Sequence, residues 1–315
     1  MGVYSVSQWL LFFFIYCFAG WIWESCYVSV RQKRWVNRGF LHGPFLPIYG
    51  SGAIVILIST IGVRNSPFLV FLFGMISSTI LEFVTGCCME KLFGVRYWDY
   101  SKMPLNVKGH ICVFASIGWG LFSVLLVCFA HKPVETAVLF IPNTISDIVA
   151  FVCVVAMSAD FTQSFNEAMN LKAALEKFTS SNEQFKTISR RLEIASAFVE
   201  DDYNKFKEKI AEVRAKGTLK GKARLPLEYV LEIKKNVKLE SIQDMVEKVK
   251  EALTNKSVDE KGANQILETL ENEKHKVGST STREYKSISR IIKRNPYTVS
   301  HKHTDALKEI KEIFK

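Results

Sequence analysis

Five long apolar stretches dominate the first half of the chain. A helix that crosses a bilayer needs about 20 mostly apolar residues, because each backbone polar group must be hydrogen-bonded within the segment. A soluble core accounts poorly for so many stretches of this length. The sequence therefore predicts an all-α, polytopic membrane protein with five transmembrane helices in residues 1–160. The five stretches run approximately from Ser7 to Val30, Gly43 to Gly62, Ser66 to Met89, Gly109 to Ala130 and Val134 to Ala159.

Charged residues are concentrated in the second half of the chain. The first 165 residues contain 10 Lys or Arg and 7 Asp or Glu, which leaves 31 of the 41 basic and 24 of the 31 acidic residues for the last 150. All 6 Trp and all 7 Cys lie between Trp9 and Cys153. The cysteines are dispersed through apolar runs, so a secreted disulfide scaffold is excluded. The first half of the chain therefore suits a lipid environment, and the second half suits water.

Lys and Arg in the short loops predict the orientation in the membrane, because cytoplasmic loops are enriched in these residues. The first and third loops are rich in them, whereas the second and fourth each offer one, Arg64 and Lys132. We therefore expect a multi-pass protein of the cell membrane with the N-terminus outside and the C-terminal tail cytoplasmic. The basic residues of the rich loops are Arg31, Lys33, Arg34, Arg38, Lys91, Arg96, Lys102 and Lys108.

The tail has a helical pattern throughout. From Leu171 to Val213, apolar positions alternate at steps of four and three, the spacing of a left-handed coiled coil. Additional apolar residues widen this stripe, so both a dimer and an intramolecular hairpin remain open. We predict a long cytoplasmic helix over 161–216, a linker over 217–226 and a helical domain over 227–315. Within that domain, helices are expected at about 227–253, 257–274, 282–294 and 304–314.

Carboxylates inside the predicted spans are the first candidates for function, since an ionised group in hydrocarbon is costly unless it is paired or faces water. Glu24, Glu82 and Asp147 lie within spans, and Glu90 follows Glu82 on the same helical stripe at the predicted cytoplasmic edge. Snorkelling to the interface is an equally good interpretation for Glu24 and Glu90. For Glu82 and Asp147 we expect a functional or ion-paired role.

Two loops on the predicted cytoplasmic side complete the candidate site. The first contains Gly and Pro residues that break the opening of the second span, and such backbone is tolerated at membrane depth only against protein or water. The second is dense in polar and aromatic residues, which indicates a folded loop. The predicted structural residues of these loops are Gly39, Gly43, Pro44, Pro47, Tyr49, Trp98 and Tyr100. The predicted polar cavity, where a substrate would bind, is lined by Glu24, Glu82, Glu90, Arg96, Asp99, Asn106, His110 and Asp147.

Several other chemistries find little support in the sequence. The spacing of Cys87, Cys88, His110, Cys112 and His42 matches a zinc site poorly, so no metal and no cofactor are predicted. Hydrolase and metalloprotease signatures are missing. The stretch from Gly217 to Ala223 is one residue short of a Walker A loop and ends in Ala. Interspersed charges in the tail favour contact with anionic lipid over nucleic acid.

Three motifs resemble the CmpB family over roughly Ile15 to Val155. They are Gly39-Phe40-Leu41-x-Gly43-Pro44-Phe45-x-Pro47-Ile48-Tyr49-Gly50, the run from Met89 to Ser101, and Asn106-x-x-Gly109-x-x-Cys112. The segments from Ser289 to Pro296 and from Asp305 to Glu309 also resemble the way in which longer members end. This family comprises bacterial multi-span proteins classed as ABC-transporter permeases of type IV. The resemblance implies transport driven by an ATPase on a separate chain.

Three functions follow as hypotheses. The first is a permease-like component without enzymatic activity of its own, which contacts lipid and works with a separate ATPase. The second is a non-transporting scaffold or sensor that recruits partners, or a second copy of itself, through the coiled coil. The third is an intramembrane lipid-modifying enzyme that uses Glu82, Glu90, Asp99 and His110 as acid, base or metal ligands.

Overall fold

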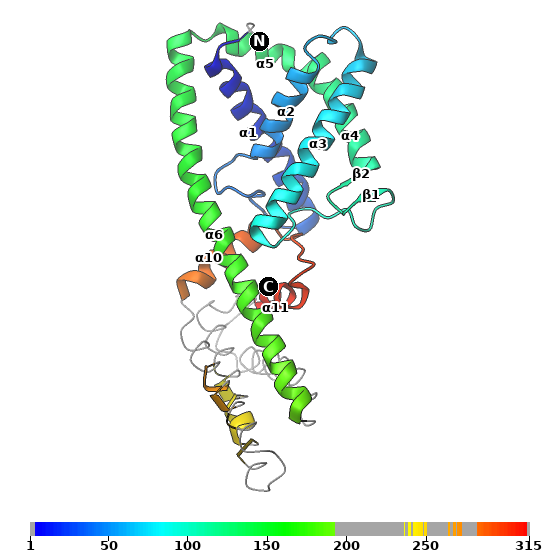
Figure 1. The fold of residues 1–315 in the computed structure, drawn as a ribbon. Helices are drawn as coiled ribbons and strands as arrows, with labels where there is room; N and C mark the ends of the chain where they lie inside the picture. Colours follow the sequence, from blue (N-terminus) through cyan, green and yellow to red (C-terminus); the bar gives the residue numbers. More distant parts are fainter. Residues whose placement is uncertain are drawn as a thin grey trace. The chain divides into compact units, whose positions relative to one another are not determined.

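The computed structural model describes residues 4–192, 236, 239–240, 242–247, 249–250, 264, 267–268, 270–272 and 282–313. These residues are mainly helical (Figure 1). The elements are α1 (Val6–Gln32), α2 (Pro47–Ser59), α3 (Pro67–Phe93), the short strands β1 (Asn106–Val107) and β2 (Ile111–Cys112), α4 (Val113–Leu125), the π-helical turn η1 (Leu126–Ala130), α5 (His131–Phe140), α6 (Asn143–Leu192), α10 (Thr282–Arg294) and α11 (Thr304–Ile313).

Four helices are long and apolar enough to cross a membrane: Val6–Gln32, Pro67–Phe93, Val113–Phe140 and Asn143–Lys177. The expectation of a helical membrane protein is confirmed. The expectation of five spans is not, because α2 has only 13 residues. At 1.5 Å per residue this helix is about 20 Å long, shorter than the roughly 30 Å of a hydrocarbon core.

The boundary between the last two spans also differs from the prediction. The helix continues through His131-Lys132-Pro133 and ends at Phe140. Proline has no N–H to donate and its ring crowds the preceding turn. The chain accommodates this with η1, in which the His131 N–H bonds to the carbonyl of Leu126 five residues earlier. The predicted break is therefore a change of helix type, and α6 begins only at Asn143.

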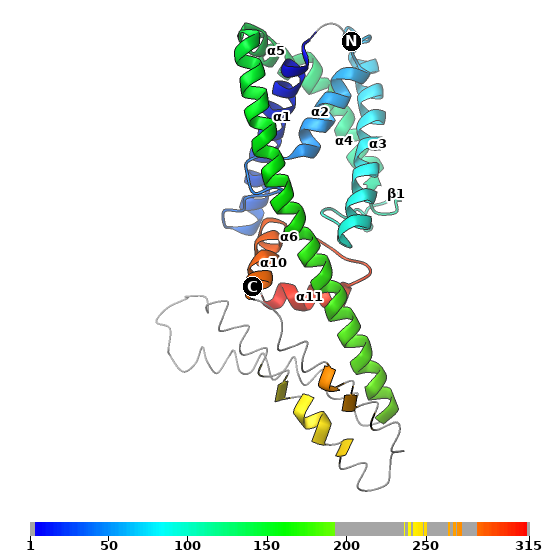
Figure 2. The ribbon, with the colours of Figure 1, turned by 60° about the vertical axis from the view of Figure 1, so that its left-hand side comes forward.

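The segment between α1 and α2, residues 33–46, turns back along α1 (Figures 1 and 2). Lys33 ends α1 in the left-handed conformation, with φ of 50°. At the other end of the segment, the Leu46 N–H donates to the carbonyl of Cys17, near the middle of α1, at 3.0 Å. This re-entrant segment and the short α2 together take the place of the predicted second span. The predicted break at the opening of that span is present.

Small residues let α1 and α2 approach closely. A Cβ on Gly20 would lie 2.3 Å from the ring of Tyr49, and one on Gly50 would lie 2.4 Å from Cys17 Sγ and 2.6 Å from the carbonyl oxygen of Phe13. The core between the helices is filled by fully buried apolar side chains, among them Phe12, Ile56, Leu57, Val70 and Leu126. Close backbone approach at small residues is typical of helix packing in membranes.

The chain divides into two compact units. The first comprises Met1–Lys172 and Ile288–Thr304, so part of the tail belongs to the membrane unit. The second comprises Ala173–Ser287 and Asp305–Lys315. The side chains of Ile242, Met245 and Val249 are buried at the helical spacing predicted for 227–253.

The tail predictions meet the structure only in part. Helices α10 and α11 match those expected at 282–294 and 304–314. The part of the coiled-coil prediction that falls on 193–213 lies outside the described residues. The linker 217–226 and most of 257–274 also lie outside them. The choice between dimer and hairpin stays a prediction.

Replacing Gly50 with Ala should destabilise the bundle, because the new methyl group meets the backbone of α1. Overpacking of this kind costs roughly 1–3 kcal/mol. Gly118→Ala is the matched control, since a Cβ there has no atom within 4 Å and alanine favours a helix. Thermal unfolding in detergent should show a lower midpoint for Gly50→Ala alone. Equal midpoints for both variants would contradict the close α1–α2 packing.

Candidate functional site

Polar side chains gather at the end of the bundle where the re-entrant segment, the α3–α4 loop and residues 288–304 meet. The two loops rich in Lys and Arg both lie at this end. The opposite end holds the N-terminal residues and the two poor loops, as the hydrogen bond from Tyr4 to Glu135 indicates. As predicted, the two loops rich in Lys and Arg share one end of the bundle, and the two loops poor in these residues share the other.

Side chains from α1 and α6 satisfy the N–H groups of the re-entrant segment. Ser29 Oγ accepts from the N–H of Val36 at 2.9 Å, and Ser25 Oγ accepts from that of Arg38 at 3.1 Å. The Asp160 carboxylate accepts from two successive N–H groups, those of His42 at 2.9 Å and Gly43 at 2.7 Å. Non-helical backbone survives at membrane depth only with such partners.

Residues 288–304 supply further partners. Asn295, which is 1% exposed, donates from Nδ2 to the carbonyl of Gly39 at 2.9 Å and accepts from Arg38. The backbones of Arg96 and Val299 form an antiparallel bridge, with N···O distances of 2.7 and 3.0 Å. The last part of the chain therefore contacts both loops of this end.

His42 lies between two carboxylates of α6. Its Nδ1 is 3.0 Å from Asp160 Oδ1, and its Nε2 is 3.1 Å from Glu167 Oε2. Glu167 is buried and also pairs with Arg290 at 2.6 Å and Arg294 at 3.0 Å. One network thus joins the re-entrant segment, α6 and α10.

Glu24 has a cationic partner. Its carboxylate accepts from the Tyr49 hydroxyl at 2.9 Å and lies 3.5 Å from Arg38 Nε. Tyr49 is in the first turn of α2, which Pro47 opens at a position where proline is well tolerated. The broken entry to α2 therefore places an aromatic hydroxyl and a guanidinium against a carboxylate of α1.

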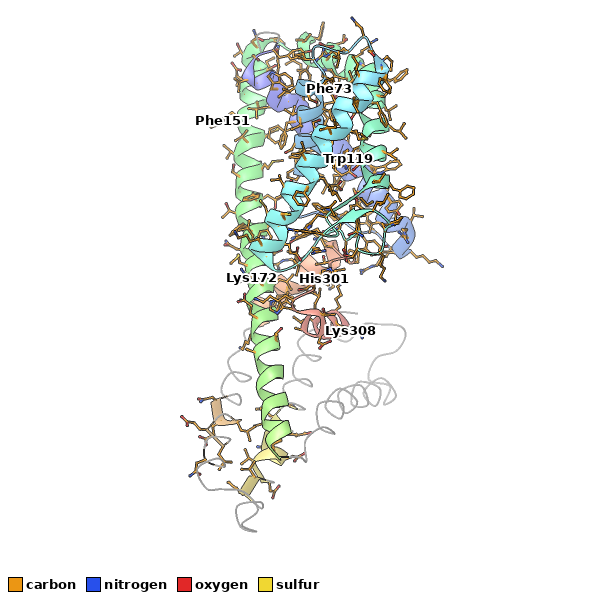
Figure 3. The ribbon with its side chains drawn as sticks, turned by 45° about the vertical axis from the view of Figure 1, so that its right-hand side comes forward. Phe73, Trp119, Phe151, Lys172, His301 and Lys308 are labelled. Carbon is orange, nitrogen blue, oxygen red and sulfur yellow. The ribbon has the colours of Figure 1, made fainter. Side chains whose placement is uncertain are left out.

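Glu82 is 5% exposed and has only uncharged partners among the described residues. The Tyr100 hydroxyl donates to Oε1 at 3.1 Å, and Trp119 Nε1 donates to Oε2 at 3.0 Å. Burial, and then the charge of Glu82, raise the pKa of Tyr100 above its ordinary value, so this phenol stays neutral. Trp119, labelled in Figure 3, lies on α4, and its ring centroid is 6.1 Å from that of Tyr49 on α2.

Glu90, Arg96, Asp99 and His110 form a third cluster. Arg96 Nε donates to Glu90 at 2.7 Å, and its Nη1 lies 3.4 Å from Asp99. His110 Nε2 is 3.1 Å from the other oxygen of Glu90. Burial opposes ionisation of Asp99, but hydrogen bonds from the Ser101 hydroxyl and N–H lower its pKa below the ordinary value. Burial and the charge of Arg96 lower the pKa of His110, against the pull of Glu90.

The remaining loop residues shape the chain around this cluster. Asn106 donates to the carbonyl of Met103 at 2.8 Å and accepts from the N–H of Gly109 at 3.0 Å, so it holds the hairpin of β1 and β2. Trp98 Nε1 donates to the carbonyl of His110 at 2.9 Å. Gly109 has φ of 73°, which favours glycine. Asn106 is thus placed for a structural role.

Asp147 does not join the other predicted site residues. It lies in the second turn of α6, and Ser7 near the start of α1 donates to it. The prediction placed it deep within a span because that span was expected to begin at Val134. The helix begins nine residues later, so Asp147 lies near the other end of the bundle.

Several residues of the network were not predicted, namely Ser25, Ser29, Asp160, Glu167, Arg290, Arg294 and Asn295. Asp160 follows the predicted end of the fifth span directly, and its position at a membrane edge was the available signal. The role of Asn295 depends on a contact 256 residues away in sequence. In the part of the chain that the structure describes, no group of three or more His, Cys, Asp or Glu could hold a metal ion.

The lowered pKa of His110 predicts a pH dependence of stability. The folded protein binds this proton less readily than the unfolded chain, whose histidine titrates near about 6.5. The contribution is therefore complete above about pH 6.5 and is lost as pH falls through the folded-state value. We expect thermal stability to fall more on acidification in the wild type than in His110→Gln. An unchanged slope in His110→Gln would contradict the assignment.

Comparisons with known proteins agree with the resemblance seen in the motifs. Residues 11–165 match a family model, ABC_trans_CmpB, which is described as "Putative ABC-transporter type IV". No curated protein and no solved structure matched the chain. The matched range contains the re-entrant segment, Glu24, Glu82, Glu90 and Asp160. Over residues 11–165 this chain is therefore similar to the CmpB family, as the three motifs predicted.

Proposed function

We propose that the protein is a permease-like component of a membrane transporter that works with an ATPase on a separate chain. The observation that carries this proposal is the re-entrant segment. Its non-helical backbone reaches the middle of α1, and the segment pairs its own Arg38 with Glu24 of α1. In transporters, discontinuous helices with freed backbone groups at membrane depth form substrate sites. The family description supports the same class of function.

The proposed orientation places this network on the cytoplasmic side. Both loops rich in Lys and Arg, with residues 288–304, lie at one end of the bundle, which supports a cytoplasmic tail and an external N-terminus. Basic residues at this end would also contact the anionic lipids of the inner leaflet. An ATPase subunit would then meet the same face that holds Glu90, Arg96 and Asp99.

One observation favours the scaffold or sensor as a second candidate. Helix α6 continues without interruption from Asn143 to Leu192, so a single element belongs to both compact units. Such a helix would transmit a displacement of the membrane unit to the tail, or the reverse. Under this proposal the tail recruits the partner proteins through which the protein acts.

A replacement within the tail separates the two functions. Simple truncation at Phe178 does not, because it also removes Arg294 and Asn295 from the membrane unit. A variant in which a Gly/Ser linker replaces residues 193–281 keeps these contacts. In cells lacking the native protein, we expect this variant to retain part of the export or uptake phenotype. The Glu24→Gln and Arg38→Gln variants should lose it while remaining folded.

Each outcome decides between the candidates. Full loss of phenotype with the linker variant, together with normal folding, would favour the scaffold. Unchanged phenotypes in Glu24→Gln and Arg38→Gln would remove the basis of the permease proposal. Purification of the full-length protein from native membranes should also yield a chain with a Walker A loop, and its absence would contradict the ATPase partnership.

A further inference from the structure

Among the described residues, Glu82 differs from the other glutamates of this polar end in having no cationic partner. Glu24 pairs with Arg38, Glu90 pairs with Arg96, and Glu167 pairs with two arginines. The two hydrogen-bond partners of Glu82 in the described part of the chain, Tyr100 and Trp119, are both uncharged. An ionised carboxylate so deep in a membrane helix carries an uncompensated charge, and proteins relieve that cost by neutralising the group.

The described residues around Glu82 supply no cation that would compensate a negative charge on its carboxylate. On the α1 side, Glu24 and Arg38 pair with one another across Tyr49. One turn further along α3, His110 packs against Gly86 and faces Glu90 instead. Cys112, on β2, carries no positive charge. Among the described residues, the elements packed around Glu82 therefore present no cation to it.

Ser78 strengthens the case for a polar site at this position. It lies four residues before Glu82, hence on the same face of α3. The residue is 2% exposed, and its hydroxyl has no hydrogen-bond partner among the described residues. Glu82 is thus one of two buried polar groups on a face where hydrocarbon side chains would pack at lower cost.

The two donors decide which oxygen can carry a proton. An indole N–H only donates, so Trp119 fixes Oε2 as an acceptor. A phenolic hydroxyl both donates and accepts, so a proton on Oε1 can be donated to Tyr100. Tyr100 belongs to the α3–α4 loop, where the next residues, Ser101 to Leu105, are exposed to solvent.

We propose that Glu82 is a proton-binding site of the membrane unit and exchanges its proton with water through Tyr100. On uptake, the phenol O–H bond breaks and its proton passes to Glu82 Oε1, while a hydronium ion protonates the phenol oxygen and leaves as water. On release, each transfer runs in the opposite direction. The phenol is restored in each cycle and charge is conserved. The inference goes beyond the permease proposal, because a bound proton is detectable whether or not a solute crosses the membrane.

The first test detects the bound proton in the full-length protein in lipid vesicles at neutral pH. Infrared spectra should contain the C=O stretch of a protonated carboxyl group that Glu82→Gln lacks and Glu24→Gln retains. Dicyclohexylcarbodiimide, which reacts with protonated carboxyls in apolar surroundings, should label Glu82 more strongly than Glu24, whose carboxylate is paired with Arg38. A spectrum unchanged by Glu82→Gln, or labelling of Glu82 suppressed by added sodium ion or methylammonium, would overturn the proposal.

The second test addresses the route. After transfer to heavy water, the carboxyl band should shift more slowly in Tyr100→Phe than in the wild type. Trp119→Phe is the matched control, because it removes the donor to the other oxygen and should leave the rate unchanged. Equal rates in Tyr100→Phe and wild type would exclude Tyr100 as the route. Loss of solute transport with an intact carboxyl band would affect the permease proposal alone.

Discussion

The structure depends on hydrogen bonds between side chains and a stretch of non-helical backbone. Residues 33–46 turn back to the middle of α1, where lipid would leave their N–H and C=O groups unsatisfied. Serines of α1, Asp160 of α6 and Asn295 near the end of the chain supply the partners. Because these partners come from distant parts of the sequence, the same interactions bring α1, α6 and residues 288–304 together.

Charge pairing follows from this arrangement. The returning segment carries Arg38 to Glu24, so two groups that would be costly alone neutralise one another. It also places His42 within hydrogen-bonding distance of Asp160 and Glu167. The α3–α4 loop likewise pairs Glu90 with Arg96. Glu82 alone among these glutamates is left with uncharged donors, which is why it stands out as a proton-binding site.

Much of this was predictable from the sequence. Apolar length predicted the membrane helices, and Gly39, Gly43, Pro44 and Pro47 predicted a break before α2. Helical spacing predicted that Glu82 and Glu90 share one stripe of α3, and Glu82 is buried on that helix. The count of five spans is not confirmed, because α2 is a half-length helix. Asp147 lies nearer the start of its helix than expected, because the helix that contains Pro133 continues to Phe140 and α6 begins only at Asn143. The contacts of Asn295 and Arg294 join residues far apart in sequence, which helical periodicity does not report.

Hydrogen exchange of the amides of His42 and Gly43, measured in vesicles, tests the central claim most directly. These N–H groups are held by Asp160 at 2.9 and 2.7 Å, so we predict slow exchange in the wild type. Asp160→Ala should accelerate exchange at both amides, while Asp147→Ala, on the same helix near the other end of the bundle, should not. Fast exchange in the wild type, or equal exchange in both variants, would contradict a re-entrant segment held by α6.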